Sequence, residues 1–448
     1  MRTEARLLIA LATPILAAQL AQQALAFVDT VMAGRVSATD LAGVAVGGSI
    51  WGPIFLFLYG ILLATTPMVA QLYGAGKLAE TGPLARRGLV AALPFMLISI
   101  LLLRNADFIF VRMDVEPQVA FIAAEYLKAI SWGMPAMALF FLLRNLSEGL
   151  GLVRPSMLIG LASIPVNVAA NYIFIYGKLG LPAMGGVGCG WASAISIWFM
   201  AGCMLHTIWK LRQYNKTHFF DLEKKSAPGG ARQVLKLGLP IGFSLLVEAS
   251  IFALIALFLA PLGALAVASH QITLNYSSLI FMIPLSLSSA ITIRVGHAIG
   301  RQRLDRARLV SKTGLSLSST LALLTAILTL CFAESIASIY THDRQLIEIA
   351  IGLLYLNALY QIPDAFQVGA AAALRGHKDT RVPLFMVVIA YWVIGLPLGY
   401  SLALTNFWGT PLGAKGFWIS LIVGLSIAAL LLGLRLLNVA GKQPAVQN

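Results

Sequence analysis

The sequence has few charged residues: Asp, Glu, Lys and Arg make up 11% of its 448 residues, against about 25% in an average soluble domain. Hydrophobic residues make up 59%, and the mean hydropathy is +0.84. A chain of this composition cannot cover its surface with polar groups. A soluble enzyme is therefore excluded, and an integral membrane protein is indicated.

Cysteine is scarce, and the common metal and nucleotide motifs are missing from the sequence. The three cysteines, Cys189, Cys203 and Cys331, lie in apolar stretches without CxxC spacing, so neither a disulfide framework nor a zinc site is expected. The six histidines form no HExxH pattern, and no complete phosphate-binding loop is present. We expect no cofactor and no ATP hydrolysis in this chain.

Long apolar runs are abundant, and each is close to the roughly 20 residues that a membrane-spanning helix needs. The runs are continuously apolar, whereas barrel strands alternate over about 10 residues. The sequence therefore predicts an all-α integral membrane protein. Its twelve predicted transmembrane helices lie near residues 7–32, 44–72, 88–106, 118–143, 156–176, 187–209, 234–260, 265–293, 313–333, 346–373, 382–404 and 415–437.

Negative charge is in short supply, with 18 Asp and Glu residues against 32 Lys and Arg residues and a net charge of +14. Of these 32 basic residues, 25 fall at the termini and in the loops on one side of the twelve predicted helices. Basic residues mark the cytoplasmic side of a membrane protein. We therefore predict that both termini and the long loop 210–233 are cytoplasmic. Topology explains the basic excess, so no nucleic-acid partner is needed.

An internal repeat relates the two halves of the chain. Pro14 corresponds to Pro240, and Gly74 corresponds to Gly300, with the same offset along the chain in both pairs. Each half contains an even number of predicted helices, so the halves are parallel repeats.

The repeat predicts two pseudo-symmetric six-helix lobes around a central cavity. The predicted domains are an N-lobe of residues 1–209, a cytoplasmic linker of residues 210–233 and a C-lobe of residues 234–448.

Three acids lie inside predicted membrane spans: Asp29, Glu248 and Asp364. An Asp at the centre of a membrane helix costs about 2.5 to 3.5 kcal/mol on insertion scales, so such a residue normally has a function. The repeat does not duplicate these acids, which suggests separate ion-handling or substrate-handling sites. Glu125 and Glu148 lie near span ends, where we expect them to be solvated.

Polar residues accompany the acids at helical spacing. In the tenth span, Asn357, Tyr360, Asp364 and Gln367 lie along one helix face. Pro363 is expected to kink this helix and to free a carbonyl that could coordinate a cation. Other polar residues inside spans are candidates for ion or substrate contact, although interhelical contacts explain them equally well: Gln22, Ser49, Asn167, Asn171, Gln271 and Asn275.

The chain resembles the multidrug and toxic compound extrusion (MATE) transporters, specifically their NorM-like branch. The similarity covers nearly the whole sequence and includes the segments TPILAAQLAQQALAFVDTVMAG, PVNVAANYIF, LLVEASIF and YQIPDAFQVGAAAALRGHKDTRVP. The resemblance implies two six-helix lobes that form a V-shaped cavity. It also implies antiport of organic cations, including antibiotics, against Na⁺ or H⁺ in a bacterial inner membrane.

The resemblance also implies two sets of cation-coupling residues. Asp29 is similar to the acid of the family's N-lobe, with Asn167, Asn171 and Ser193 beside it; Ser193 stands where relatives often have Thr. Glu248, Tyr360 and Asp364 look like the C-lobe cation site. Na⁺ is expected at one of these two sets, and whether the Asp29 set takes Na⁺, a proton or the drug stays open.

Substrate contacts are expected from the acids Asp29, Glu248 and Asp364 together with Gln22, Ser49, Gln271 and Asn275. We expect small organic cations and membrane lipids as partners of a monomeric protein.

Three other functions compete with this hypothesis. A lipid-linked saccharide flippase of the same superfamily would tend to carry basic residues in its cavity, whereas the central candidates here are acidic. An intramembrane enzyme is disfavoured because His270 and the nearby serines form no recognisable nucleophile and base pair. A passive channel would differ from an antiporter in being unable to move its substrate uphill.

Overall fold

The computed structural model describes residues 1–223 and 230–441 of the chain. Within these residues every regular element is a helix, which confirms the predicted all-α class. The basic residues Lys224, Lys225 and Lys442, which entered the predicted topology, lie outside the described residues.

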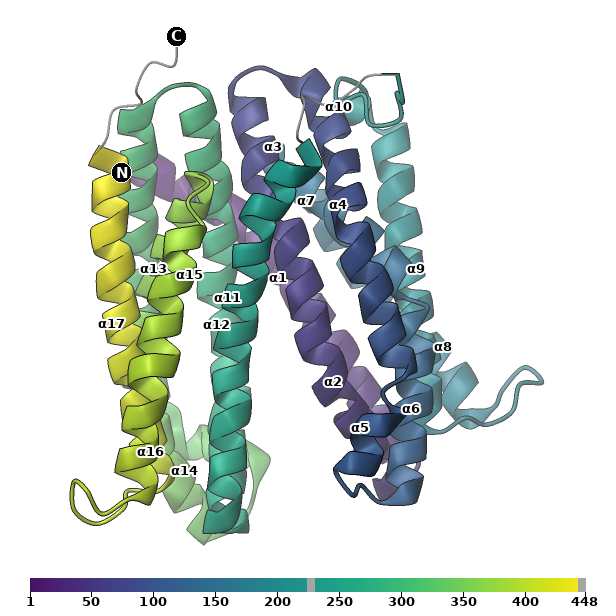
Figure 1. Cartoon of the computed structure of the whole chain (residues 1–448), viewed down its shortest axis with the longest axis vertical. Coiled ribbons are helices and arrows are strands. Elements are labelled where there is room, and N and C mark those ends of the chain that lie inside the picture. The colour runs from purple at the N-terminus through teal and green to yellow at the C-terminus, as the bar shows by residue number, and fades with distance from the viewer. Residues whose placement is uncertain (224–229, 442–448) are drawn as a thin grey trace. The chain divides into compact units, whose positions relative to one another are not determined.

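The helices before the linker include the first six predicted spans (Figure 1). They are α1 (Arg2–Gly34), α2 (Ala38–Leu63), α3 (Thr65–Gly74), α4 (Leu78–Arg104), α5 (Asp107–Arg112), α6 (Pro117–Ser131), α7 (Met134–Gly149), α8 (Arg154–Tyr176), α9 (Gly186–Lys210) and α10 (Arg212–Asn215). After the linker come α11 (Gly230–Leu259), η1 (Ala260–Leu262), α12 (Ala264–Gly300), α13 (Leu304–Tyr340), α14 (Arg344–Gly376), α15 (Arg381–Val388), η2 (Ile389–Gly395), α16 (Leu396–Leu404) and α17 (Ala414–Gly441).

Eleven helices in the described part of the chain are long and apolar enough to cross a membrane, and a bent pair adds a twelfth span. The bent pair is α6 and α7, whose axes differ by 51°. Its counterpart in the repeat, α14, is not broken at Pro363, so the kink expected there does not interrupt the helix. Twelve spans agree with the sequence prediction.

The repeat is visible in the helix boundaries. The span Ala38–Gly74 and the helix Ala264–Gly300 begin and end at equivalent positions of the repeat, with the offset that also relates Pro14 to Pro240. Ser37 is the N-cap of α2 and its hydroxyl accepts a hydrogen bond from the Asp40 backbone N–H (2.9 Å), whereas Gly263 takes the N-cap position of α12. These two corresponding spans therefore have the same length, 37 residues.

The helices form two compact units. The N-unit is Pro14–Gly242, and the C-unit is Met1–Thr13 together with Phe243–Asn448. Helices α1 and α11 each contribute to both units, and Pro14 and Pro240 lie near these divisions. The predicted lobe boundaries at residues 209 and 234, and the central cavity, stay predictions.

Charged and apolar contacts hold the first turns of α1 in the C-unit. Glu4 is buried and pairs with Arg294 of α12 (2.6 Å) and with Arg306 of α13 (2.8 Å). Leu8, one turn further along, is fully buried in the apolar core of the C-unit. These contacts explain why the start of α1 packs with helices from the second half of the chain.

Candidate functional site

In the N-unit, Asp29 is the centre of a buried cluster from three helices. Its Oδ1 accepts hydrogen bonds from Asn171 Nδ2 (2.6 Å) and Asn167 Nδ2 (3.2 Å) of α8. Its Oδ2 accepts one from Ser193 Oγ of α9 (2.5 Å). Asp29 is 6% exposed, and both asparagines are fully buried. The structure thus brings together all four residues that the resemblance assigned to the N-lobe site.

Helical spacing and close packing build this cluster. Asn167 and Asn171 are four residues apart on α8, so they share one face, and Asn171 Nδ2 also donates to Asn167 Oδ1 (3.1 Å). Residues Cys189 and Ser193 have the same spacing on α9. A side chain at Gly190 would come within 2.6 Å of the Tyr126 carbonyl oxygen, so only glycine permits this approach of α9 to α6.

The donors that reach the Asp29 carboxylate are amides and a hydroxyl, which carry no formal charge. In addition, the Oδ1 atom of Asn171 is buried and has no hydrogen-bond partner. A buried carboxylate is costly to keep charged unless a proton or a cation neutralises it. Its own oxygens and the free Asn171 oxygen are ligands of the kind that hard cations prefer.

In the C-unit, Glu248 of α11 and the polar face of α14 lie together. Gln367, one turn after Asp364 on α14, donates from its Nε2 to Glu248 Oε1 (3.1 Å). Tyr360, one turn before Asp364, packs edge-on against Trp418 with ring centroids 5.6 Å apart. Asp364 and Tyr360 are each only 6% exposed. The three residues predicted for the C-lobe site are therefore neighbours.

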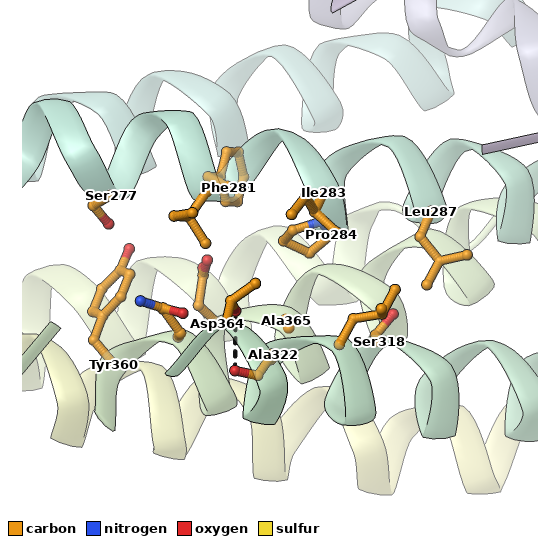
Figure 2. A pocket seen from close by; sticks show the side chains of 14 residues that line it. Ser277, Phe281, Ile283, Pro284, Leu287, Ser318, Ala322, Tyr360, Asp364 and Ala365 are labelled. Carbon is orange, nitrogen blue, oxygen red and sulfur yellow. Dashed lines mark hydrogen bonds between the residues drawn. The ribbon is translucent and has the colours of Figure 1, made fainter. Parts of the chain in front are cut away.

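Asp364 and Tyr360 line a narrow slot between α12, α13 and α14. Figure 2 shows both side chains pointing from α14 toward α12, which contributes Ser277 to the wall. The slot is so thin that only about one water-sized occupant fits inside it. An organic cation is much too large for it.

Several oxygens along the slot have unused hydrogen-bonding capacity. Gln361 Oε1 and Ser318 Oγ are buried without a hydrogen-bond partner. Gln361 Nε2 is occupied, because it donates to Thr329 Oγ1 (3.0 Å) and Asn357 Oδ1 (3.1 Å). Unpaired buried oxygens beside a carboxylate favour a small polar occupant, either a water molecule or a cation.

The weaker candidates for substrate contact have other partners. Gln22 Oε1 accepts from Arg144 Nη1 (3.3 Å) in the N-unit. Ser49 is exposed, and its hydroxyl donates to the Val46 carbonyl of the same helix (2.7 Å). Gln271 Nε2 donates to Asn275 Oδ1 (3.1 Å), and both residues are exposed on α12. The substrate roles of these four residues stay predictions.

The expectation that Glu148 is solvated is wrong. Its side chain is 3% exposed and accepts from Arg144 Nε (2.6 Å), one turn earlier on α7. Arg144, which entered the topology as a cytoplasmic charge, is equally buried. The spacing of four residues between a cation and an acid was the available signal. Glu125, by contrast, is 39% exposed and pairs with Lys128 as expected for an interfacial residue.

Sequence reasoning missed Tyr391. It lies in the π-helical turn η2 (Ile389–Gly395) between α15 and α16, is 4% exposed, and belongs to the same buried core as Tyr360. A π-turn reorients side chains and is often found at functional sites. Nothing in the local sequence marks this turn, since its residues also fit an ordinary apolar helix.

A repeated all-helical fold with buried acids in both units is typical of a membrane transporter. The chain belongs to the MatE family, whose sequence model matches residues 14–173 and 240–401, one block in each half of the repeat.

Curated relatives match nearly the entire chain. Multidrug resistance protein NorM of Photobacterium profundum is 46% identical over 435 residues, which cover 97% of this chain and 95% of that protein. Multidrug resistance protein MdtK of Yersinia pestis (strain Pestoides F) is 46% identical over 439 residues, with the same coverage.

Solved structures share the fold at low identity. A eukaryotic MATE transporter has a TM-score of 0.88 at 19% identity and covers 98% of both chains. An outward-facing multidrug resistance MATE family transporter of the MOP superfamily has a TM-score of 0.87 at 18% identity, covering 98% of this chain and 97% of that chain. The family assignment confirms the resemblance found in the sequence. The protein is a multi-pass membrane protein, and the expectation of a transporter in place of an enzyme is confirmed.

Proposed function

We propose that this protein is a multidrug efflux antiporter that exports small organic cations in exchange for Na⁺ or H⁺. Two relatives that are 46% identical over 97% of the chain are named multidrug resistance proteins, which supports the substrate class. In this proposal the protein works as a monomer in a bacterial inner membrane, surrounded by lipid and with both termini in the cytoplasm.

The observation that carries the proposal is the slot beside Asp364. A buried carboxylate faces a space that admits about one water-sized occupant, and a second acid, Glu248, accepts a hydrogen bond from Gln367 one turn further along α14. Such a site can take a proton or a partly dehydrated Na⁺ but no drug molecule. Occupation by the small cation cancels one of the two negative charges of Asp364 and Glu248, and its release restores negative charge that attracts an organic cation in a wider space.

The Asp29 cluster supports a second acidic site of the same kind. Its neutral donors stabilise the carboxylate, and the free Asn171 oxygen adds a ligand for Na⁺. An alternative use is direct contact between Asp29 and the drug. In either case, two lobes that expose the acids alternately to the two sides of the membrane would couple entry of the small cation to export of the drug.

Stoichiometry determines how much work the exchange can do. One proton per monovalent drug moves no net charge, so it supplies about 1.4 kcal/mol per pH unit, which is a tenfold concentration ratio. Two protons per drug would add about 2.3 kcal/mol per 100 mV of membrane potential. The two acid sites in separate units make the second scheme feasible.

The test is efflux of a fluorescent organic cation from tight vesicles of known protein orientation, with a Na⁺ gradient and a proton gradient imposed separately. We expect one gradient to drive uphill efflux by the wild type and Asp364→Asn to abolish it. Asp305→Asn is the matched control, because Asp305 is fully exposed at the start of α13. It should transport normally.

Three results would overturn the proposal. Normal uphill efflux by Asp364→Asn would remove Asp364 from the coupling mechanism. Failure of both gradients to drive wild-type efflux would favour a lipid-linked saccharide flippase, and efflux only down the gradient of the dye would favour a passive channel.

A further inference from the structure

The C-unit has an apolar groove on the surfaces of α13, α14 and α17, separate from the slot beside Asp364. Its volume is about 620 Å³, within the roughly 300 to 1,000 Å³ of a usual small-molecule pocket. Leu315, Phe366 and Gly433 line it from the three helices. Figure 1 shows α13 and α17 beside each other along the side of this unit.

The charge of the groove is confined to one end. Arg308 and Lys312 lie one turn apart near the start of α13. The Arg308 guanidinium donates to the carbonyl oxygens of Ala440 and Gly441 at the end of α17, which fixes its position, and also lies 3.7 Å from Asp305. Lys312 is exposed and lines the same end of the groove. The remaining lining is mainly aliphatic.

The charged end coincides with the predicted edge of the membrane. The apolar stretch predicted to span the bilayer begins at residue 313, directly after Lys312. On α17 the groove extends from Ala429 to Gly441, which is roughly 18 Å at about 1.5 Å per residue. One leaflet of the hydrocarbon core is about 15 Å thick. Because the predicted span ends at residue 437, the part of the groove inside the hydrocarbon runs from Ala429 to Leu437 and covers roughly 12 Å of one leaflet.

The apolar wall is open to the lipid. Leu430, Leu434 and Leu437 are 51% to 66% exposed along it. Between them, a Cβ atom at Gly433 would lie 3.2 Å from Phe366 Cε1, so the absence of a side chain leaves room above the Phe366 ring. A larger residue at position 433 would fill the groove from its floor.

We propose that this groove binds an anionic phospholipid, with its phosphate at Lys312 and Arg308 and an acyl chain along α17. Two cations at headgroup level above an aliphatic channel match the charge and the shape of such a lipid. Basic pockets between membrane helices on the cytoplasmic side are known to select anionic headgroups. The proposal does not depend on what the protein transports.

The test measures lipid retained by the purified full-length protein, by native mass spectrometry in detergent. The protein is titrated with dioleoyl phosphatidylglycerol or with dioleoyl phosphatidylcholine, which has the same chains and no net charge. We expect preferential retention of phosphatidylglycerol. Lys312→Gln should lower that retention about fivefold, which corresponds to about 1 kcal/mol for one surface cation.

Two further variants separate charge from shape. Lys236→Gln removes an exposed lysine of α11 that is not part of the groove, and it should leave retention unchanged. Gly433→Leu should reduce retention of both lipids, because the leucine side chain occupies the acyl-chain space. The melting temperature of this variant shows whether its fold is intact. Glycerol phosphate, which has no acyl chain, should not displace the lipid.

Equal retention of the two lipids by the wild type would overturn the proposal, and so would undiminished phosphatidylglycerol binding in Lys312→Gln. Displacement by glycerol phosphate would indicate a free phosphate site in place of a lipid site. Because Lys312 is exposed, its substitution should not disturb folding. Retention is measured without transport, so failure of the antiport proposal would leave these results interpretable.

Discussion

Arg144 and Glu148 form a fully buried ion pair on one face of α7, with Nε and Oε1 2.6 Å apart and both side chains 3% exposed. Gln22 of α1 accepts a further hydrogen bond from Arg144, and the guanidinium lies 5.9 Å from the Phe141 ring centroid. The pair therefore links the transmembrane part of α1 to α7. Burying two charges is stabilising only while each has its partner.

Removal of one partner should therefore be costly. Arg144→Met leaves Glu148 buried without its cation, and we expect the free energy of unfolding to fall by about 3 to 5 kcal/mol. Adding Glu148→Leu should restore part of this loss, because the uncompensated charge is then gone. Thermal unfolding in detergent measures both. Glu125→Gln, in an exposed pair with Lys128, serves as the control and should cost about 0 to 1 kcal/mol. An equally small effect of Arg144→Met would contradict the importance of the buried pair.

Substitutions at two acids of the N-unit should have different effects: one should abolish export, and the other should lower stability. Asp29→Asn keeps the shape of the side chain but removes its charge, so we expect export to be lost. Asp40 is structural: its Oδ1 accepts from the Gly186 backbone N–H (2.6 Å), and Asp40→Ala should lower stability by about 1 to 3 kcal/mol while export of the folded fraction continues. Vesicle efflux and thermal unfolding of both variants give the comparison. Normal export by Asp29→Asn would exclude Asp29 from the coupling mechanism.

The repeat places a glycine and a glutamine at equivalent turns. Gly76 has φ +76°, and Gln302, its counterpart in the second half of the repeat, has φ +58°. This left-handed conformation costs a residue with a Cβ about 1 to 2 kcal/mol. Gln302→Gly should therefore raise stability by about 0.5 to 1 kcal/mol, since greater freedom of glycine in the unfolded chain offsets part of the gain.

Gly76→Gln is the reciprocal variant of the same repeat position. Nothing lies within 4 Å of a Cβ at Gly76, so its effect reports backbone strain alone. It should lower stability by about 1 kcal/mol. Melting temperatures that move in the same direction for both variants would contradict the assignment of strain to these turns.

Stability should depend on pH through His377, which follows α14 outside the membrane span. Burial lowers the pKa of His377 below its ordinary value, and Asp379 opposes this effect only in part. The unfolded chain then binds the proton more readily than the folded protein. The stability contribution is complete above the ordinary value of about 6.5 and is lost as the pH falls toward and through the lowered folded-state pKa.

His377→Gln should make the melting temperature less sensitive to pH below about 6.5. His342→Gln, at an exposed histidine, is the matched control and should keep the wild-type dependence. The measurement is a series of thermal unfolding curves from neutral to mildly acidic pH. An unchanged slope in His377→Gln would show that the buried imidazole is not the titrating group.

Much of the fold could be predicted because lipid imposes a simple rule on sequence. Every span must be helical and apolar over about 20 residues, so the twelve spans and the repeat could be read from composition and prolines. The break between α6 and α7 could not, because the corresponding helix α14 contains a proline as well and stays continuous. Whether a proline helix bends depends on the helices that pack around it.

The sequence by itself determined the membrane class, the family, and the acids Asp29, Glu248 and Asp364, since charge inside an apolar run is visible in one dimension. Only the tertiary structure decided which side chains meet those acids. Ser193 reaches Asp29 from a helix far along the chain, and Tyr391 joins the buried core around Tyr360 through a π-turn. The tertiary structure also decided that Arg144 and Glu148 are buried. Hydrogen bonding and burial depend on how helices distant in sequence pack together, and a pattern along one helix does not specify its neighbours.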